Sequence, residues 1–186
     1  GQIAMTPYYN TTPENAGGHL VVGLGLKLTT GDYNYKDYFQ KEGGPTLLPV
    51  DQSIQPGDGG LGLITEVDIS RHIAGKFSGY FSAMYMFNPR NTNGVLRRAT
   101  PYTVHATGAA IPLSNELSVG DQYFWRLGAA FTANGFQAGL GARMEGIPSK
   151  DIIGKSDGFR RPGYIVSAEP SVAYATGAHS FGMNFP

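Results

Sequence analysis

The chain of 186 residues contains no cysteine, carries no net charge and has no long apolar run. Without cysteine it can form no disulfide, no zinc–thiolate site and no thiol nucleophile. The balance of 14 basic and 14 acidic residues argues against a nucleic-acid-binding protein, because such proteins usually carry a basic patch or stripe. No segment approaches the roughly 20 consecutive apolar residues that a membrane-spanning helix needs.

Glycine and the aromatic residues are abundant instead. The 27 glycines and 12 prolines are too many for a helical protein, whereas the 11 tyrosines and 10 phenylalanines favour strands. The composition therefore predicts an all-β protein, and the length fits a single domain over residues 1–186.

Apolar residues alternate with small or polar ones in segment after segment. Between Leu20 and Thr29 every second residue is Leu or Val, while the intervening positions include Gly23, Gly25 and Lys27. A period of two is a strand signal, because successive side chains point to opposite faces of a strand. The same pattern predicts eight strands, at residues 2–10, 20–29, 61–70, 77–88, 123–132, 136–145, 164–175 and 180–185.

The connections between these strands alternate between short and long. Asn134-Gly135 is a two-residue hairpin signal, because both residue types tolerate a positive φ. The long connections, predicted as outer loops, cover residues 30–60, 89–121 and 146–163. Short turns at one end and long loops at the other are typical of an antiparallel up-and-down transmembrane β-barrel.

One face of the predicted strands collects charges and glycines. In a soluble sandwich this face would be the outside, but in a membrane barrel it must face the lumen, because a charge facing lipid costs roughly 2–4 kcal/mol at the midplane. Glycines between the charges leave room for long side chains inside a closed wall, and this favours the membrane barrel. The charged positions of this face are Lys27, Glu66, Asp68, Arg126, Arg143, Glu145 and Glu169.

Aromatic residues gather near the strand ends, as anchors at the two membrane interfaces would. Ordinary enrichment of aromatics in strands is the alternative explanation. We place one group at the short-turn end and the other at the long-loop end: Tyr8, Tyr9, Phe77, Phe136 and Tyr174, and then Phe87, Tyr123, Trp125, Tyr164 and Phe185.

This topology places both chain ends on the outer side, whereas complete outer-membrane barrels usually have periplasmic ends. We therefore expect at least one further strand at each end, and a full barrel of ten or more strands of which about eight are visible here. The chain would then be incomplete, a processed fragment, or one part of a larger assembly.

Several loop sequences resemble a group of predicted outer-membrane transporters of Gram-negative bacteria, loosely related to the barrel family associated with phenol meta-pathway degradation. The resemblance rests on GLGLKLTTGDYN at 23–34, PVDQSIQPGDGG at 49–60, FNPRNTNG at 87–94 and the segment at 146–164 that begins GIP and ends SDGFRRPGY. It implies an outer-membrane barrel of around a dozen strands, longer than this chain, and no catalytic residues.

Two loop motifs suggest binding chemistry. The segment GDGGLG at 57–62 matches a dinucleotide-binding pattern, but that pattern requires a strand before it and a helix after it. A proline-rich loop precedes it here, and this favours a flexible loop. Asp51 and Asp58 are the best candidates for a calcium site, yet their spacing matches no calcium loop, and solvated carboxylates are the favoured interpretation. We therefore predict no metal and no cofactor.

The histidines and loop arginines suggest no enzyme. His179 precedes Ser180, a pair used in acyl transfer, but adjacent strand residues point to opposite faces and cannot readily bond. His19, His72 and His105 have no partner at catalytic spacing. Arginines decorate the long loops, where they either contact lipopolysaccharide phosphates or solubilise exposed loops: Arg97, Arg98, Arg160 and Arg161.

The sequence therefore predicts a non-enzymatic channel or transporter of the bacterial outer membrane, passing small solutes, hydrophobic or aromatic ones included, along the seven charged residues. Met84 and Met86 would line an apolar path. The expected partners are outer-membrane lipid, lipopolysaccharide, the solute and other membrane subunits, with no nucleic acid.

The first alternative is a plugged structural or interaction barrel whose Tyr-rich loop 32–39 docks a partner within a larger assembly. The second is a soluble β-barrel that binds a small ligand.

Overall fold

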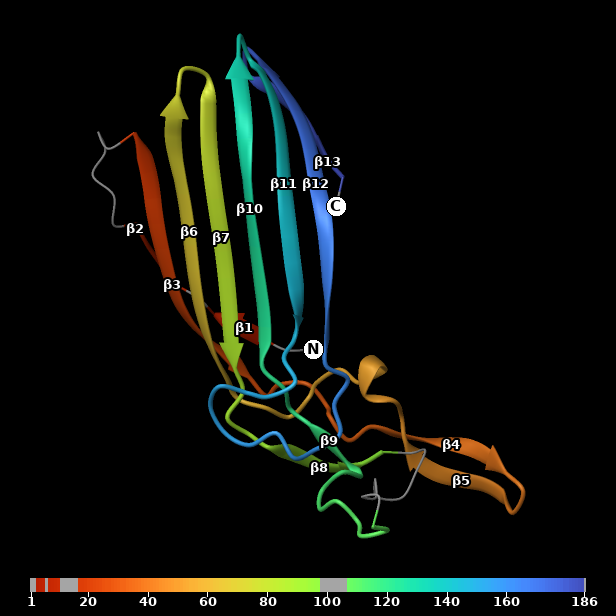
Figure 1. The fold of residues 1–186 in the computed structure, drawn as a ribbon. Helices are drawn as coiled ribbons and strands as arrows, with labels where there is room; N and C mark the ends of the chain where they lie inside the picture. The colour runs from red at the N-terminus through yellow and green to blue at the C-terminus, as the bar shows by residue number, and fades with distance from the viewer. Residues whose placement is uncertain (1–2, 6, 11–16, 98–106, 186) are drawn as a thin grey trace.

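A computed structural model describes residues 3–5, 7–10, 17–97 and 107–185 of the chain (Figure 1). Its main element is one antiparallel sheet in the order β1-β3-β6-β7-β10-β11-β12-β13, with β2 also paired to β3. The strands are β1 (Ile3–Met5), β2 (Tyr8–Asn10), β3 (Gly18–Leu28), β6 (Gly62–Ala74), β7 (Phe77–Phe87), β10 (Gln122–Ala133), β11 (Phe136–Ile147), β12 (Gly163–Thr176) and β13 (His179–Asn184). The predicted all-β meander is confirmed.

Short turns join three pairs of neighbouring strands. The predicted turn at Asn134-Gly135 is present, and both residues have a positive φ, 50° and 79°. This backbone matches the right-handed twist of the two strands it joins. Gly75 and Gly177 open the other two turns, also with positive φ. Figure 1 shows all three turns at the upper end of the sheet and the long connections at the lower end.

The first predicted strand, at residues 2–10, is interrupted. β1 pairs with β3, and Ile3 lies opposite Leu28. β2 pairs with β3 in the same register, and Tyr8 lies opposite Gly23. Pro7 lies between the two pieces and has no N–H to donate to β3. Proline is tolerated here because this strand lies at an edge of the sheet.

Two of the three long connections contain structure that the prediction of loops missed. β4 (Lys36–Lys41) and β5 (Gly44–Pro49) form a separate hairpin in the first connection, followed by the 3-10 helix η1 (Gln52–Ile54). β8 (Thr92–Leu96) and β9 (Glu116–Ser118) pair within the second. Strand β11 also extends two residues into the third connection, as far as Ile147.

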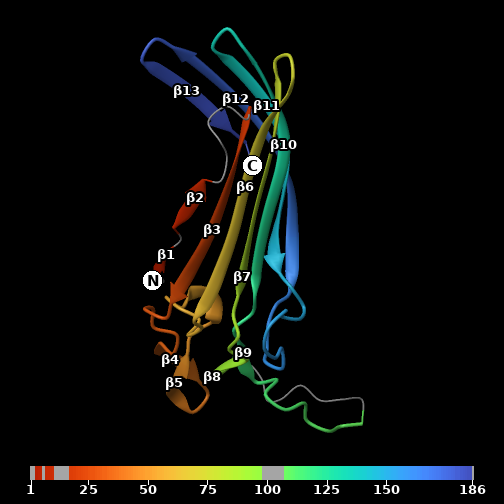
Figure 2. The same ribbon diagram turned by 90° about the vertical axis from the view of Figure 1, so that its left-hand side faces the viewer.

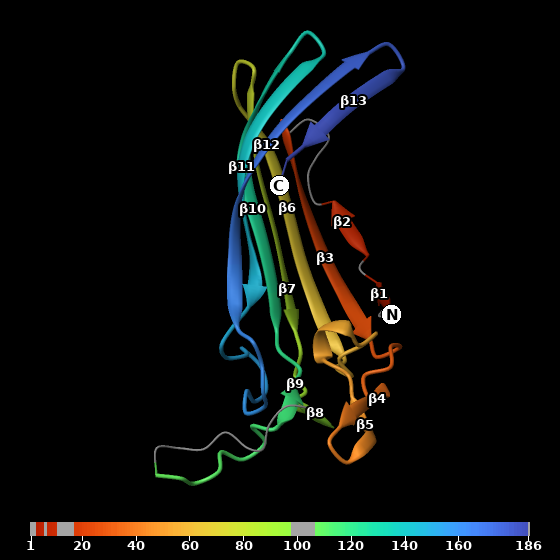
Figure 3. The same cartoon turned by 90° about the vertical axis from the view of Figure 1, so that its right-hand side faces the viewer.

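The sheet is strongly curled, and its two faces differ (Figures 2 and 3). Both views place η1 on the concave side, at the lower end. Lys27 contacts Asp58, which follows η1, so the face that carries Lys27 is concave. Side chains that converge on a concave face shield one another, and Lys27, Ser82 and Met86 are accordingly buried.

The convex face is apolar and exposed. Cross-strand register places its residues in line, as with Leu20, Ile69 and Phe81. Leu140 is 64% exposed, and the other large apolar residues that alternate on this face are also open: Leu20, Val22, Leu24, Leu26, Leu63, Leu127 and Val172. The described residues thus form a half-barrel with its apolar side outward, and no pairing among them joins β13 to β1 or β2.

Three aromatic positions differ from their predictions. The Phe185 N–H donates to the carbonyl of Pro170, which lies near the middle of β12, so Phe185 is not at the long-loop end. Tyr8 and Tyr9 pair with the middle of β3, opposite Gly23 and Val22, rather than with its short-turn end. Within the described segments no helix is both long enough and apolar enough to cross a membrane.

Candidate functional site: the charged concave face and the loops beneath it

The predicted charged residues of the sheet meet on its concave face. Asp68 stands opposite Ser82, Ser82 opposite Arg126, and Arg126 opposite Arg143, so these side chains form one row across four strands. Glu66 and Glu145 lie in the adjacent row towards the long connections, and Glu169 lies in the adjacent row towards the short turns. The structure therefore brings six of the seven together, across strands β6 to β12.

Arg126 and Arg143 are like charges directly opposite each other, an arrangement that alone would be unfavourable. Each guanidinium has its own partners. Arg143 contacts Glu145 at 2.5 Å and Glu169 at 3.7 Å. Arg126 donates to the Ser82 hydroxyl at 3.4 Å, and that hydroxyl donates to Asp68. Acidic and hydroxyl partners on either side of the arginine pair thus offset the two like charges.

Lys27 lies apart from this network, near the long connections. Its ammonium is 2.7 Å from Asp58 in the first connection, and its side chain is only 2% exposed. Asp58 also accepts a hydrogen bond from the Gly60 N–H, and Arg90 donates to the Gly59 carbonyl. These bonds fasten the segment after η1 to the inner wall of the sheet.

Tyr80 lies across two glycines of neighbouring strands. A Cβ at Gly128 would be 2.5 Å from the Tyr80 hydroxyl and 2.6 Å from Cζ, and a Cβ at Gly141 would also collide with the hydroxyl. The Arg126 guanidinium is 5.8 Å from the Tyr80 ring centroid. The glycines of the polar face therefore make room for an aromatic ring that packs beneath a charge.

We expect Gly141→Ala to cost about 1–3 kcal/mol of unfolding free energy, because the new methyl displaces Tyr80. Adding Tyr80→Phe should recover most of this loss, since the nearest remaining atoms, the Leu127 carbonyl oxygen and Cζ of the ring, lie 3.1 and 3.3 Å away. Gly128→Ala is the matched control, because there Cζ and the Leu140 carbonyl still collide after the hydroxyl is removed. Urea unfolding of Gly141→Ala and Gly128→Ala, each with and without Tyr80→Phe, measures these changes in unfolding free energy. Equal recovery at both glycines would contradict the prediction.

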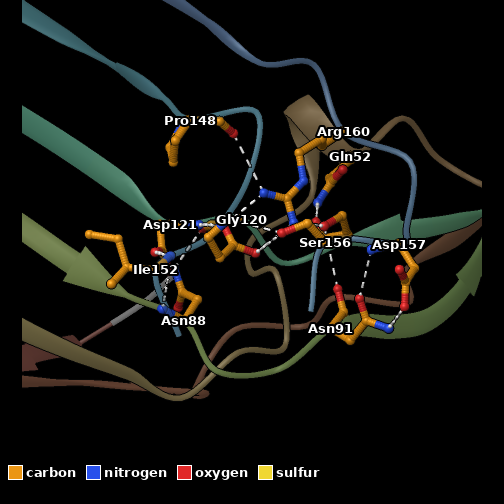
Figure 4. Close-up of polar contacts among 12 residues, drawn as sticks. Gln52, Asn88, Asn91, Gly120, Asp121, Pro148, Ile152, Ser156, Asp157 and Arg160 are labelled. Carbon is orange, nitrogen blue, oxygen red and sulfur yellow. Dashed lines mark hydrogen bonds and ion pairs between the residues drawn. The ribbon is translucent and has the colours of Figure 1, made fainter. Parts of the chain in front are cut away.

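A buried polar cluster joins the connections below the sheet (Figure 4). Asp121 is fully buried and accepts hydrogen bonds from the Tyr85 hydroxyl and from the N–H groups of Asn88 and Ile152, at 2.9, 2.7 and 3.0 Å. The Asn88 amide donates to the Gly120 carbonyl at 2.7 Å. We call residues 88–93, 116–121 and 148–161 the loop platform. Asp121 holds it to the end of β7.

Arg160 is not the exposed loop charge that one sequence interpretation favoured. Its side chain is 7% exposed, and it donates two hydrogen bonds to Asp151, at 2.7 and 2.6 Å, and one to Ser118 at 2.7 Å. Arg161, by contrast, is exposed and lies 3.3 Å from Asp51. Arg98 and His105 lie outside the described residues.

The loop platform should lose stability in acid. Burial alone would raise the pKa of the Asp151 carboxyl, but hydrogen bonds from Arg160 and from the Asp121 N–H outweigh it and hold that pKa below the ordinary 3.8. A depressed folded-state pKa contributes stability that is complete above the unfolded value and disappears as the pH falls through the folded value.

The thermal unfolding midpoint of the wild type should therefore fall as the pH drops below 3.8. Asp151→Asn should unfold at a lower temperature at neutral pH, and its midpoint should depend less on pH in this range. An equal acid dependence in both proteins would contradict this assignment.

The weak metal candidates have other partners. Asp51 accepts from the N–H and hydroxyl of Ser53, which lowers its pKa, and it caps η1. Asp58 is paired with Lys27. Within the described segments no group of three His, Asp or Glu side chains could hold a metal ion. The segment GDGGLG at 57–62 leads into strand β6 and not into a helix, so the dinucleotide pattern lacks its required context.

One serine–histidine contact was missed. The Ser70 hydroxyl lies 2.8 Å from Nδ1 of His19, because the two residues are directly opposite on β6 and β3. His179 and Ser180 are adjacent residues of β13, as predicted. Cross-strand register was the only signal that could have shown the His19–Ser70 pair, and it could not be read before strand pairing was known.

Comparison with known proteins identifies no family for this chain. A scan against models of protein families finds no match. A search of curated proteins also finds none.

Proposed function

We propose that this chain forms the wall of a β-barrel channel in the bacterial outer membrane, through which small solutes pass passively. The observation that carries the proposal is the exposed apolar convex face opposite a charged concave face. The six long strands have 11 to 14 residues, enough for tilted strands to cross the roughly 30 Å hydrocarbon core. Lipid and lipopolysaccharide are then the partners of the convex face.

A barrel in a bilayer cannot leave a strand edge open, because an unpaired backbone group in hydrocarbon costs several kcal/mol. The edges at β1–β2 and at β13 must therefore pair, either with each other or with further strands. A barrel of ten or more strands would satisfy both edges, and the resemblance to the predicted outer-membrane transporters implies a barrel of that size.

The inner wall offers two kinds of surface to a solute. The charged rows around Arg126 suit polar or zwitterionic solutes, because opposed charges create a transverse field. Nearer the loops, Met84 and Phe124 stand opposite each other and are half-buried, beside the buried pair Met86 and Ile64. This short apolar section suits the hydrophobic or aromatic solutes.

Single-channel conductance in a planar bilayer tests the proposal. We expect discrete conductance steps from the folded protein. Glu66→Gln should shift ion selectivity towards anions and Arg126→Gln towards cations, because each removes one fixed charge from the wall. Met183→Gln on the convex side of β13 is a neutral control that should leave selectivity unchanged. Unaltered selectivity in both charge variants would contradict a pore lined by this face.

The second candidate is a plugged structural barrel in a larger assembly, and one observation favours it. The Lys27–Asp58 pair fastens the segment after η1 to the concave face, near the long-loop end of the sheet. A folded, bilayer-inserted protein that conducts no ions would support this candidate over the channel.

A further inference from the structure

An open groove of about 650 Å³ lies across strands β6, β7 and β10. Val67, Ala83 and Trp125 form one row of its lining, since Ala83 stands opposite both of the others. The small Ala83 side chain is flanked along β7 by the larger Phe81 and Tyr85. Phe81, Ala83 and Tyr85 are alternate residues of one strand and therefore share the convex face. The groove thus opens on the side that the proposed function turns towards lipid.

The long-loop end of the groove is fixed to the third connection. The Tyr85 hydroxyl and the Ile152 N–H donate to the same oxygen of the Asp121 carboxylate, at 2.9 and 3.0 Å. Gly154 has a φ of 99°, and a Cβ there would be 2.7 Å from the Pro89 carbonyl oxygen, so glycine is required at this close turn. Figures 2 and 3 place the third connection on the convex side of the sheet, opposite to η1. The segment around Ile152 is therefore held at the end of the groove.

That segment, residues 150–155, has the sequence KDIIGK and places two isoleucines between two lysines. Ile152 is 67% and Ile153 48% exposed. Figure 4 shows the Ile152 side chain extending away from the polar cluster. Exposed apolar side chains beside lysines are typical of segments that lie in a membrane interface, where the lysine stem follows apolar surface and the ammonium stays in water. The segment thus has the pattern of a membrane-surface contact at the end of an apolar groove.

Both lysines of this segment can meet an anion. Lys150 and Lys155 are exposed, and neither forms an ion pair within the described part of the chain. Asp151, which lies between them in the sequence, is bound to Arg160 at 2.6 Å. Asp157 accepts a hydrogen bond from another part of the loop platform. Among the described residues, the two ammonium groups therefore have no counter-charge bound to them.

We infer that the groove and residues 150–155 together bind one phosphorylated membrane lipid, with an acyl chain against Ala83 and Trp125 and the phosphate at the two lysines. The volume of the groove and its apolar and aromatic lining suit a hydrocarbon chain. Lysines bind phosphate as point charges. Lipopolysaccharide carries both acyl chains and phosphates, so it is the lipid that this site would hold in the outer leaflet. The inference rests on the proposed membrane barrel but not on conduction through it.

Trp125 reports directly on the groove, because it is the only tryptophan of the chain and lies in the lining. Brominated acyl chains quench a tryptophan that they contact. The full chain is inserted into phosphatidylcholine vesicles that contain a minor share of either brominated phosphatidic acid or brominated phosphatidylcholine. At equal share, brominated phosphatidic acid should quench Trp125 more strongly, because the lysines hold its phosphate. Unlabelled lipopolysaccharide should relieve this quenching by displacing the brominated lipid.

The double variant Lys150→Gln, Lys155→Gln tests the phosphate end of the site. It should reduce the preference for phosphatidic acid about tenfold, as the loss of two lysine contacts with an anionic lipid predicts. Lys36→Gln, Lys41→Gln is the matched control, with the same spacing and the same change of net charge. Both of these lysines are exposed and lie in the β4–β5 hairpin, which Figure 1 shows projecting away from the sheet. This control should keep the full preference.

Ala83→Leu tests the acyl end of the site, because the larger side chain fills the middle of the groove. It should also lower the preference for phosphatidic acid, without any change of charge. Ala129→Leu is its control, since Ala129 stands opposite Leu140 on the same face but outside the lining. Equal preferences in these two variants would contradict the placement of the chain in the groove.

Equal quenching by the two brominated lipids, or equal losses in the two lysine double variants, would overturn the inference. An inserted protein whose Trp125 is quenched by neither lipid would also overturn it, as a second copy seated on the groove would produce. A protein that prefers phosphatidic acid but conducts no ions would keep the site and refute the channel. A conducting protein without the preference would keep the channel and refute the site.

Discussion

Asp58→Asn is expected to cost about 3–5 kcal/mol of unfolding free energy, because it leaves the Lys27 ammonium buried without a counter-charge. Asparagine keeps an oxygen that can accept a hydrogen bond from the Gly60 N–H. The substitution therefore removes the charge but leaves the hydrogen bond of the local turn in place. Urea unfolding in liposomes measures the loss. The same substitution should release the segment after η1 and, in a conducting barrel, enlarge the conductance steps.

The double variant Lys27→Met, Asp58→Asn separates charge from packing. Methionine preserves most of the lysine stem without its charge, and replacing a buried ion pair by apolar groups is often neutral or stabilising. We expect the double variant to recover most of the stability lost in Asp58→Asn. A double variant that is as unstable as the single one would show that the segment is held by something other than this pair.

Leu140→Arg should strongly impair insertion into a bilayer. Leu140 projects from the convex face of β11, and an arginine facing lipid near the midplane of a barrel costs about 2–4 kcal/mol. The expected result is a lower folded fraction after refolding into liposomes, measured by the gel mobility of heated and unheated samples.

Gln137→Arg provides the control for that substitution. Gln137 lies on the same strand but on the concave face, opposite Thr132, and it is exposed. An arginine there should leave insertion close to that of the wild type. If the two variants insert equally well, the convex face does not contact lipid, and the soluble β-barrel alternative becomes the better interpretation.

The strands of this protein could be predicted closely from its sequence, because alternation is a local signal. The predicted strand at 77–88 became β7 at Phe77–Phe87, and the strand at 136–145 became β11 at Phe136–Ile147. The division of side chains between the two faces followed from the same period of two. The interruption at Pro7 was visible in the sequence as a proline inside an apparent strand, and was overlooked.

The structure within the long connections could not be predicted in the same way. Asp121, Asn88 and Ile152 are brought together across about 30 residues or more, and their contacts use backbone N–H groups whose direction depends on the loop path. Arg160 has nothing in its local sequence to show that it is buried beside Asp151. The loop platform therefore forms only once the strands have fixed the ends of every connection.

The two-residue turns described above also set an order of folding. Hairpins β6–β7, β10–β11 and β12–β13 each close over a very short loop, so each can form quickly and early. The pairings of β3 with β6 and of β7 with β10 must first close more than 30 residues of chain, which carries a larger entropic cost. The row from Asp68 to Arg143 draws on two different hairpins. Its hydrogen bond from Arg126 to Ser82 joins the two hairpins and can therefore form only after they have paired, late in assembly.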